Sequence, residues 1–188
     1  MSTSKRPRGQ SVAEFALVLP VLVAFIGGIV QFGLIFWAQN TLTQVVRDTG
    51  RWEATQQTTP CTNGVSALVA QADLIAGNSS LLGYTSKEFG PNSPTTAQTS
   101  SAAVAAFSTS DALAVAWTDA TATPPPSSDL CPPPDNSQVW FATIKVNHTV
   151  PIFFPGLQYL PGLGTCDSTG CHITLSSMAV VRMEPAPL

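Results

Sequence analysis

The sequence predicts an α+β protein in which a long N-terminal helix leaves a membrane and packs on a small, mostly antiparallel β-sheet. Three observations predict this fold. An apolar stretch covers residues 12–37, an amphipathic stripe at helical spacing follows it, and alternating apolar residues dominate the C-terminal part. With 188 residues, the chain has room for an anchor and one modest outer domain.

The stretch at residues 12–37 is long enough to cross a bilayer, because roughly 20 apolar residues span the hydrocarbon core. Lys5, Arg6 and Arg8 precede it, which places the N-terminus in the cytoplasm and the rest of the chain outside. The alternative is a cleaved signal peptide, but those have an apolar region of only about 7–15 residues and a small-residue cleavage site. We therefore expect a single-pass anchor that stays attached in the cytoplasmic membrane.

The helix is expected to continue beyond the membrane, over residues 10–57. No proline interrupts the chain between Val21 and Thr59. Apolar or small side chains recur at spacings of three and four, at Leu42, Val45, Val46, Thr49 and Trp52. The first half would lie in lipid and the second half against the outer domain. Pro20 is expected to bend or loosen the helix, since it removes one backbone donor.

Residues 58–188 are expected to form the extracytoplasmic α+β domain. A second helix is predicted over residues 63–77, with Asn63 as its cap and Gly77 as its end. Residues 92–134 form an excursion rich in Thr, Ser, Ala and Pro, within which residues 111–119 alternate like a strand. Further strands are predicted at residues 139–150 and 171–184, joined by a Pro- and Gly-rich packed loop.

The composition excludes some functions. A net charge of −3 with eight basic residues offers no basic surface for nucleic acid. Catalysis needs a constellation of groups, yet the chain has two histidines, and neither a nucleophile elbow nor a phosphate-binding loop occurs. His148 falls on the apolar face of its strand, which favours a structural role. We expect neither an enzyme nor a cofactor.

The four cysteines all follow the apolar stretch, on the side where disulfides form. Four cysteines allow three pairings. We favour a local bridge from Cys166 to Cys171, across a turn that Gly170 can supply, which leaves Cys61 to meet Cys131. The alternative is a metal site that uses His172 beside Cys171. Zinc motifs normally pair two close sets of ligands, and Cys61 and Cys131 stand alone, so no metal is expected.

Glu14 is the one acid inside the apolar stretch, where a charge costs about 2.5 kcal/mol or more. It belongs to the run Gly9-Gln10-Ser11-Val12-Ala13-Glu14-Phe15, which resembles the cleavage and assembly motif of type IV pilins of the Flp/Tad branch. RGQSVAEFALVLPVLVAFIGGIVQFG and LTQVVRDTGRWEA closely resemble the N-terminal segment of TadE-like minor pilins, or pseudopilins. VNHTVPIFFPG and ITLSSMAVVRME resemble the closing part of that family. The resemblance covers about residues 8–57 and 139–184.

The resemblance implies that residues 1–9 are a leader, cut after Gly9 by a prepilin peptidase, and that the mature chain begins at Gln10. Glu14, with Phe15 beside it, would act in assembly by pairing with the freed α-amino group of a neighbouring subunit. Such pairing offsets much of the cost of burying either charge. The alternative places Glu14 in the headgroup region, with its side chain reaching the interface.

The implied function is a minor pilin-like subunit that acts in pilus assembly, adhesion or secretion. Its partners would be the prepilin peptidase, the major Flp-type pilin, other minor pilins, and the assembly platform with its ATPase. The subunit would reside in the cytoplasmic membrane and could enter the pilus. The rival interpretation is a signal-anchored envelope protein whose outer domain binds a ligand or a surface, and an anchored hydrolase is a weaker third.

Overall fold

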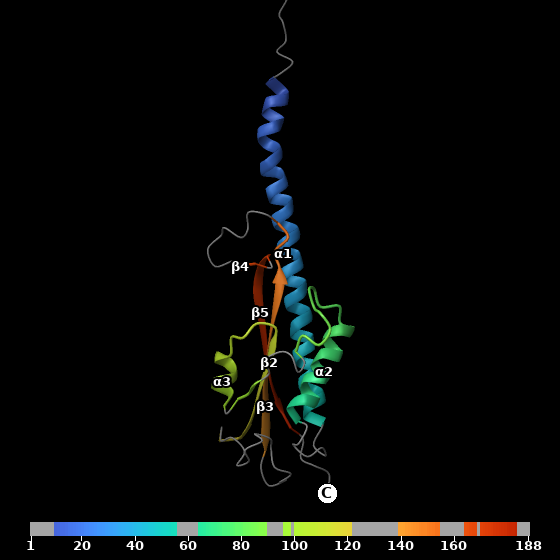
Figure 1. Ribbon diagram of the computed structural model, residues 1–188, viewed down its shortest axis with the longest axis vertical. Helices are drawn as coiled ribbons and strands as arrows, with labels where there is room; N and C mark the ends of the chain where they lie inside the picture. The colour runs from blue at the N-terminus through green and yellow to red at the C-terminus, as the bar shows by residue number, and fades with distance from the viewer. Residues whose placement is uncertain are drawn as a thin grey trace, which may run out of the picture.

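A single straight rod, α1 (Gln10–Thr55), runs through most of the length of the molecule (Figure 1). The computed structural model describes residues 10–55, 64–89, 96–98, 100–121, 139–154, 164–168 and 170–183. The first part of α1 projects alone, and the second part packs against the remaining elements (Figure 1). The helix stays continuous through Pro20, as the predicted single helix requires.

The other elements form a small α+β unit around the second part of α1. They are α2 (Gly64–Asn78), β1 (Thr96–Ala97), α3 (Ser101–Ala106), β2 (Ala112–Asp119), β3 (Trp140–Pro151), β4 (Thr165–Asp167) and β5 (Gly170–Arg182). The strands form one sheet in the order β1-β2-β3-β5-β4, in which only the short β1 pairs in parallel. The fold class predicted from the sequence is confirmed.

One face of the sheet packs on α1 and α2 and forms the main core. The amphipathic stripe supplies Ala38, Leu42, Val45 and Val46 from α1, all fully buried. Alternation along the strands supplies Leu113, Val115 and Trp117 from β2, and Ile144, Val146 and Val150 from β3. These are the faces that the period of two in the sequence predicts. Burial of this apolar surface holds the outer half of α1 to the sheet.

The opposite face of β2 is covered by α3, which the sequence did not reveal. Val104 of α3 packs on Ala114 and Ala116, so β2 is buried on both faces. Small alanines on this face let the short helix approach closely. Ser100 caps α3 by accepting a hydrogen bond from the amide of Ala103. The excursion at residues 92–134 therefore contributes two strands and a helix to the folded unit.

The boundaries differ from expectation by a few residues. The structure describes α1 up to Thr55, so the last two residues of its predicted range lie outside the described residues, and α2 ends at Asn78, one residue after Gly77. The predicted cap Asn63 lies outside the described residues. The short strand β4, which the sequence analysis did not predict, follows the expected loop, forms a hairpin with β5 and pairs Cys166 with Cys171. Residues 155–163 of that loop lie outside the described residues.

Candidate functional site

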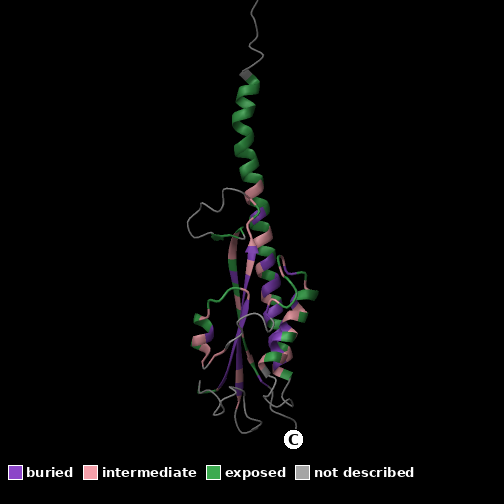
Figure 2. Cartoon of the chain, in the orientation of Figure 1, coloured by how far each residue is buried: buried purple, intermediate pink, exposed green. Residues whose placement is uncertain are grey.

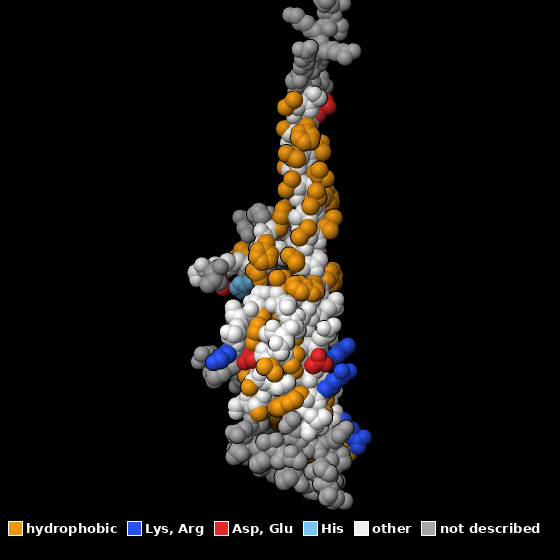
Figure 3. Space-filling model, turned by 90° about the vertical axis from the view of Figure 1, so that its right-hand side faces the viewer, with side chains coloured by type: hydrophobic (Ala, Val, Ile, Leu, Met, Phe, Trp, Pro, Cys, Tyr) orange, Lys and Arg blue, Asp and Glu red, His pale blue; other side chains and the backbone are white. Residues whose placement is uncertain are grey.

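The projecting part of α1 is the first candidate site. Every side chain from Ser11 to Ile26 is exposed (Figure 2), and most are apolar (Figure 3). A single helix, Ser11–Thr55, is long and apolar enough to cross a membrane, among the residues that the structure describes. An exposed apolar surface of this extent needs lipid or other helices around it. The structure therefore fits a single-pass membrane anchor.

The residues predicted to act in processing and assembly lie at the free end of this rod. Gln10 is the first residue of α1, while Glu14 and Phe15 lie one turn further along and are exposed. Gly9, the expected cleavage position, lies outside the described residues. The structure places all three residues towards the end of α1 that is far from the sheet (Figure 1), and there the side chains of Glu14 and Phe15 are exposed.

The outer unit reaches down α1 to Gly27, where the chain leaving β3 docks. The Gln31 side chain, which is 2% exposed, donates from Nε2 to the Pro151 carbonyl at 3.3 Å. Its Oε1 accepts from the amide of Phe153 at 2.9 Å. The ring of Phe154 lies directly over Gly27, where a methyl group would overlap it. The Gln31 side chain thus links α1 to the end of the sheet through two hydrogen bonds.

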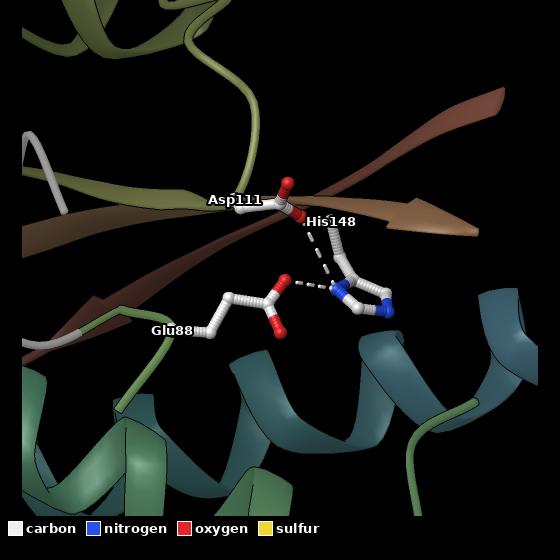
Figure 4. Close-up of side chains that lie close together, drawn as sticks. All are labelled: Glu88, Asp111 and His148. Atoms are coloured by element: carbon white, nitrogen blue, oxygen red, sulfur yellow. Dashed lines mark hydrogen bonds and ion pairs between the residues drawn. The ribbon is translucent and has the colours of Figure 1, made fainter. Parts of the chain in front are cut away.

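A second candidate site is a buried polar cluster formed by Glu88, Asp111 and His148 (Figure 4). His148 projects from β3 into the core and is 0% exposed. Its Nδ1 lies 2.6 Å from Oε1 of Glu88, in the loop after α2, and 3.5 Å from Oδ1 of Asp111, just before β2. Its Nε2 lies 2.8 Å from the Leu82 carbonyl, to which it donates. The cluster ties three separate segments together.

Asp111 and Glu88 are also held by backbone groups. Asp111 accepts from the amide and the hydroxyl of Thr149, at 2.7 Å and 2.6 Å. Glu88 accepts from the amide of Thr85 at 3.0 Å. Asp111 has a φ of 48°, a left-handed conformation that aspartate tolerates better than most residues. Each carboxylate is therefore held by at least one hydrogen bond besides its contact with His148.

The electrostatics favour a charged imidazole. Burial alone would lower the pKa of His148, but its bonds to Asp111 and Glu88 raise that pKa to about 9. For Asp111, burial raises the pKa, and the contacts with His148, Glu88 and Thr149 outweigh burial and hold it well below the usual range. Burial raises the pKa of Glu88, and its hydrogen bond with Asp111 adds to the rise, while the contact with His148 opposes it.

The ligand atoms of the three side chains lie within 4.8 Å of one another, so their donor set could in principle hold a cation. In the structure, Nδ1 of His148 contacts Oε1 of Glu88 directly. Two carboxylates around an imidazolium satisfy one another without an ion. The arrangement explains how an imidazole can be fully buried beside the partly buried carboxylates of Glu88 and Asp111.

The predicted disulfide residues fall into two groups. Cys166 on β4 and Cys171 on β5 are linked by a disulfide. Gly170, between them, has a φ of 135°, which glycine adopts readily. Cys61 and Cys131 lie outside the described residues, so their pairing stays a prediction. His172 contacts Thr165 at 3.1 Å and lies 3.8 Å from Asp167, at the surface.

A family model described as TadE-like protein matches residues 9–51. The N-terminal segment is TadE-like. No curated protein and no solved structure matches the chain. The TadE-like segment supports involvement in a Tad pilus system. It includes the projecting part of α1 with Glu14, and also Gln31, which links α1 to the sheet. It ends before the second part of the resemblance, at residues 139–184, which stays a prediction.

Sequence reasoning identified His148 as a buried strand residue and missed its partners. Glu88 and Asp111 lie 60 and 37 residues before it, in loops without a motif, so only the fold brings them together. Gln31 offered a signal, because it is the one strongly polar residue deep in an otherwise apolar stretch. A polar side chain at that depth must find a partner, and here the partner is the chain leaving β3.

Proposed function

We propose that this protein is a minor pilin-like subunit of a Tad-type pilus, anchored by α1 in the cytoplasmic membrane with the sheet outside. The observation that carries the proposal is the position of the TadE-like match. It includes the exposed part of α1, residues 11–26, where lateral contacts with other helices are available, and continues along the part of α1 that packs on the sheet. A subunit built in this way contributes contacts rather than chemistry, in keeping with the structural nature of the family.

Processing is the first step of this proposal. A prepilin peptidase on the cytoplasmic side would cut after Gly9 and release residues 1–9 as a leader. Gln10 begins α1, so the cut would fall at the start of the helix, where a protease meets backbone that is not hydrogen-bonded in the helix interior. The cut would create a free α-amino group four residues before Glu14.

Assembly is the second step. Within a bundle of such helices, the exposed Glu14 side chain would pair with the α-amino group of a neighbouring subunit. The pair would fix the axial register, because two opposite charges in an apolar bundle lose several kcal/mol when separated. The partners are the major Flp-type pilin and other minor pilins, moved by the assembly platform and its ATPase. The outer unit would then face the periplasm, or the surface of the filament.

The test is expression of the full chain with and without its prepilin peptidase, followed by N-terminal sequencing of the membrane-bound protein. The proposal expects a loss of about 1 kDa and a start at Gln10, since nine residues of average mass are removed. Gly9→Leu should block the cut, while Gly28→Leu, a glycine with open space around it, should be cut normally. A mature protein that retains the Arg8-Gly9 peptide in both conditions would contradict the proposal.

A further inference from the structure

The end of the sheet that adjoins the bare rod carries apolar side chains of its own. Residues 152–154 follow β3 and read Ile-Phe-Phe, and Phe153 is 62% exposed. In Figure 3, hydrophobic side chains on the projecting part of α1 continue onto the adjoining end of the folded unit. A histidine and an acidic side chain lie at one edge of this end, and the other coloured charges of the folded unit lie further away. This patch is continuous with the membrane anchor and is not a separate feature of the outer surface.

The position of the patch along α1 fixes its depth. A bilayer core needs about 20 apolar residues, and any such window within residues 12–37 ends no earlier than residue 31. Even a short span of about 17 residues ends no earlier than residue 28. Gly27, which the ring of Phe154 covers, therefore lies within the hydrocarbon region for every placement. The contact between the sheet end and α1 is at membrane depth.

Several backbone groups at this segment meet the condition that lipid imposes. Irregular chain at membrane depth is tolerated only where its polar groups are satisfied within the protein. The amide of Ile152 donates to the Cys171 carbonyl at 2.8 Å. Gln31 accepts from the amide of Phe153 and donates to the Pro151 carbonyl. Three consecutive residues thus have backbone groups paired inside the protein, while the Phe153 side chain stays outside.

The neighbouring aromatic residues on α1 support the same depth. Phe36 is 68% and Trp37 46% exposed, and they lie about one and a half turns beyond Gln31, towards the outer unit. Exposed tryptophan is typical of the membrane–water interface. With Trp37 at the interface, Gln31 and the segment that it holds lie on the lipid side of the boundary. After Glu14, the next charged residue along α1 is Arg47.

We propose that residues 152–154 enter the outer leaflet of the membrane beside α1, with Phe153 in contact with lipid chains and Phe154 sealed on Gly27. The inference rests on α1 being the membrane anchor of the proposed function. The partner is the hydrocarbon of the outer leaflet and not a protein. The folded unit would then be seated on the membrane by two points, α1 and this segment, at a depth set by Gln31.

The experiment places a photoreactive p-benzoylphenylalanine at single positions of the full-length protein in phosphatidylcholine vesicles. The test variant is Phe153→p-benzoylphenylalanine. Phe25, 69% exposed on the bare rod, is the positive control, and Leu74, 58% exposed on α2, is the matched control on the outer unit. After irradiation, mass spectrometry measures the yield of covalent lipid adducts. The inference expects about tenfold more adduct at positions 153 and 25 than at position 74, because only the first two touch lipid chains.

The controls separate this inference from the proposed function. Adduct at position 25 with none above background at position 153 would overturn the inference and leave the membrane anchor intact. No adduct at either position would overturn both. A second arm keeps the label at position 153 and adds Gly27→Leu, which displaces the Phe154 ring, or Gly28→Leu, which meets open space. The adduct should fall severalfold in the first variant only, and equal yields in the two would contradict the seat on Gly27.

Discussion

The indole Nε1–H of Trp117, in the middle of β2, donates a 2.9 Å hydrogen bond to Oε1 of Glu53, near the end of α1. Both residues are buried, at 1% and 6% exposure. The bond joins the last turns of the long helix to the sheet. In this helix of 46 residues, the bond fixes the end that is furthest from the proposed membrane anchor.

Substitutions of Glu53 should separate the hydrogen bond from the charge. Glu53→Gln keeps an acceptor for the indole, so the free energy of unfolding should change by less than about 0.5 kcal/mol, or rise as a buried charge is removed. Glu53→Leu leaves the indole N–H unsatisfied and should cost about 1–3 kcal/mol. Denaturant titration of the full-length protein in detergent micelles measures both. Equal stability of the two variants would show that the bond contributes nothing.

Stability should fall as the solution becomes alkaline. The pKa of His148 is raised from 6.5 to about 9 in the folded protein. Its stabilising contribution is therefore complete below about pH 6.5 and is lost as the pH rises through 9, up to roughly 3 kcal/mol if the cluster stays rigid. Thermal unfolding between pH 6 and pH 10 measures the loss. His172→Asn removes the surface histidine and should leave this pH dependence unchanged. If the alkaline loss of stability disappeared in His172→Asn, it would belong to His172 and not to His148.

Asp111→Asn should move this alkaline transition to lower pH. Asparagine tolerates the left-handed φ of 48° and still offers an oxygen to the Thr149 amide, but it removes one of the two negative charges beside His148. The pKa of His148 should therefore fall towards its ordinary value. NMR titration of the His148 ring measures the change. Asp48→Asn, on the exposed face of α1, is the control, and an unmoved pKa in Asp111→Asn would contradict the ion pair.

The exported protein should contain no free thiol. Alkylation and mass spectrometry of the unreduced protein should find Cys166 and Cys171 in one linked peptide, as the hairpin of β4 and β5 places them. Cys61 and Cys131 should form the second linked pair. The same analysis after reduction is the control. Free thiols together with one bound metal ion per chain would reverse the choice in favour of a metal site.

Glu14 should matter for assembly and not for processing. Glu14→Gln or Glu14→Ala leaves the span at least as apolar, so insertion and the cut after Gly9 should survive. If Glu14 pairs with a neighbour's α-amino group, these variants should associate with the other pilins at least a hundredfold more weakly, since about 1.4 kcal/mol is tenfold and the loss is about 3–5 kcal/mol. Co-purification after mild detergent extraction measures this. Normal co-purification of Glu14→Ala would contradict the pairing.

Glu14→Asp serves as the graded variant in that series. It keeps the charge on a shorter side chain, so association should lie between wild type and Glu14→Ala. An Asp variant as weak as Ala would point to geometry rather than charge as the controlling factor.

The parts of the fold that could be predicted are those whose signal is local. The period of two that buries Ile144 and Val146 and the helical stripe that buries Leu42 and Val45 are visible in any short window of sequence. The short helix α3 was missed because SAAVAA has little amphipathic pattern. Only its contact with the alanines of β2 gives it a place. The sheet order likewise depends on long-range pairing that no window contains.

The same distinction holds for the candidate sites. The membrane anchor and the residues around Glu14 follow from one continuous run of sequence. The cluster of Glu88, Asp111 and His148 depends on a loop, a strand entry and a strand that meet only in the folded chain. The contact of Phe154 with Gly27 could not be predicted either. Glycine is common in membrane helices, so its presence does not indicate which side chain packs on it.

The contact of Phe154 with Gly27 also marks where the folded unit begins along α1. Below it, residues 11–26 are exposed on all sides, a bare length of about 24 Å. On the flank where the folded unit rests on α1, a second helix lying alongside meets that unit at the end of this length. Close helix contact with another subunit on that flank is therefore confined to this length.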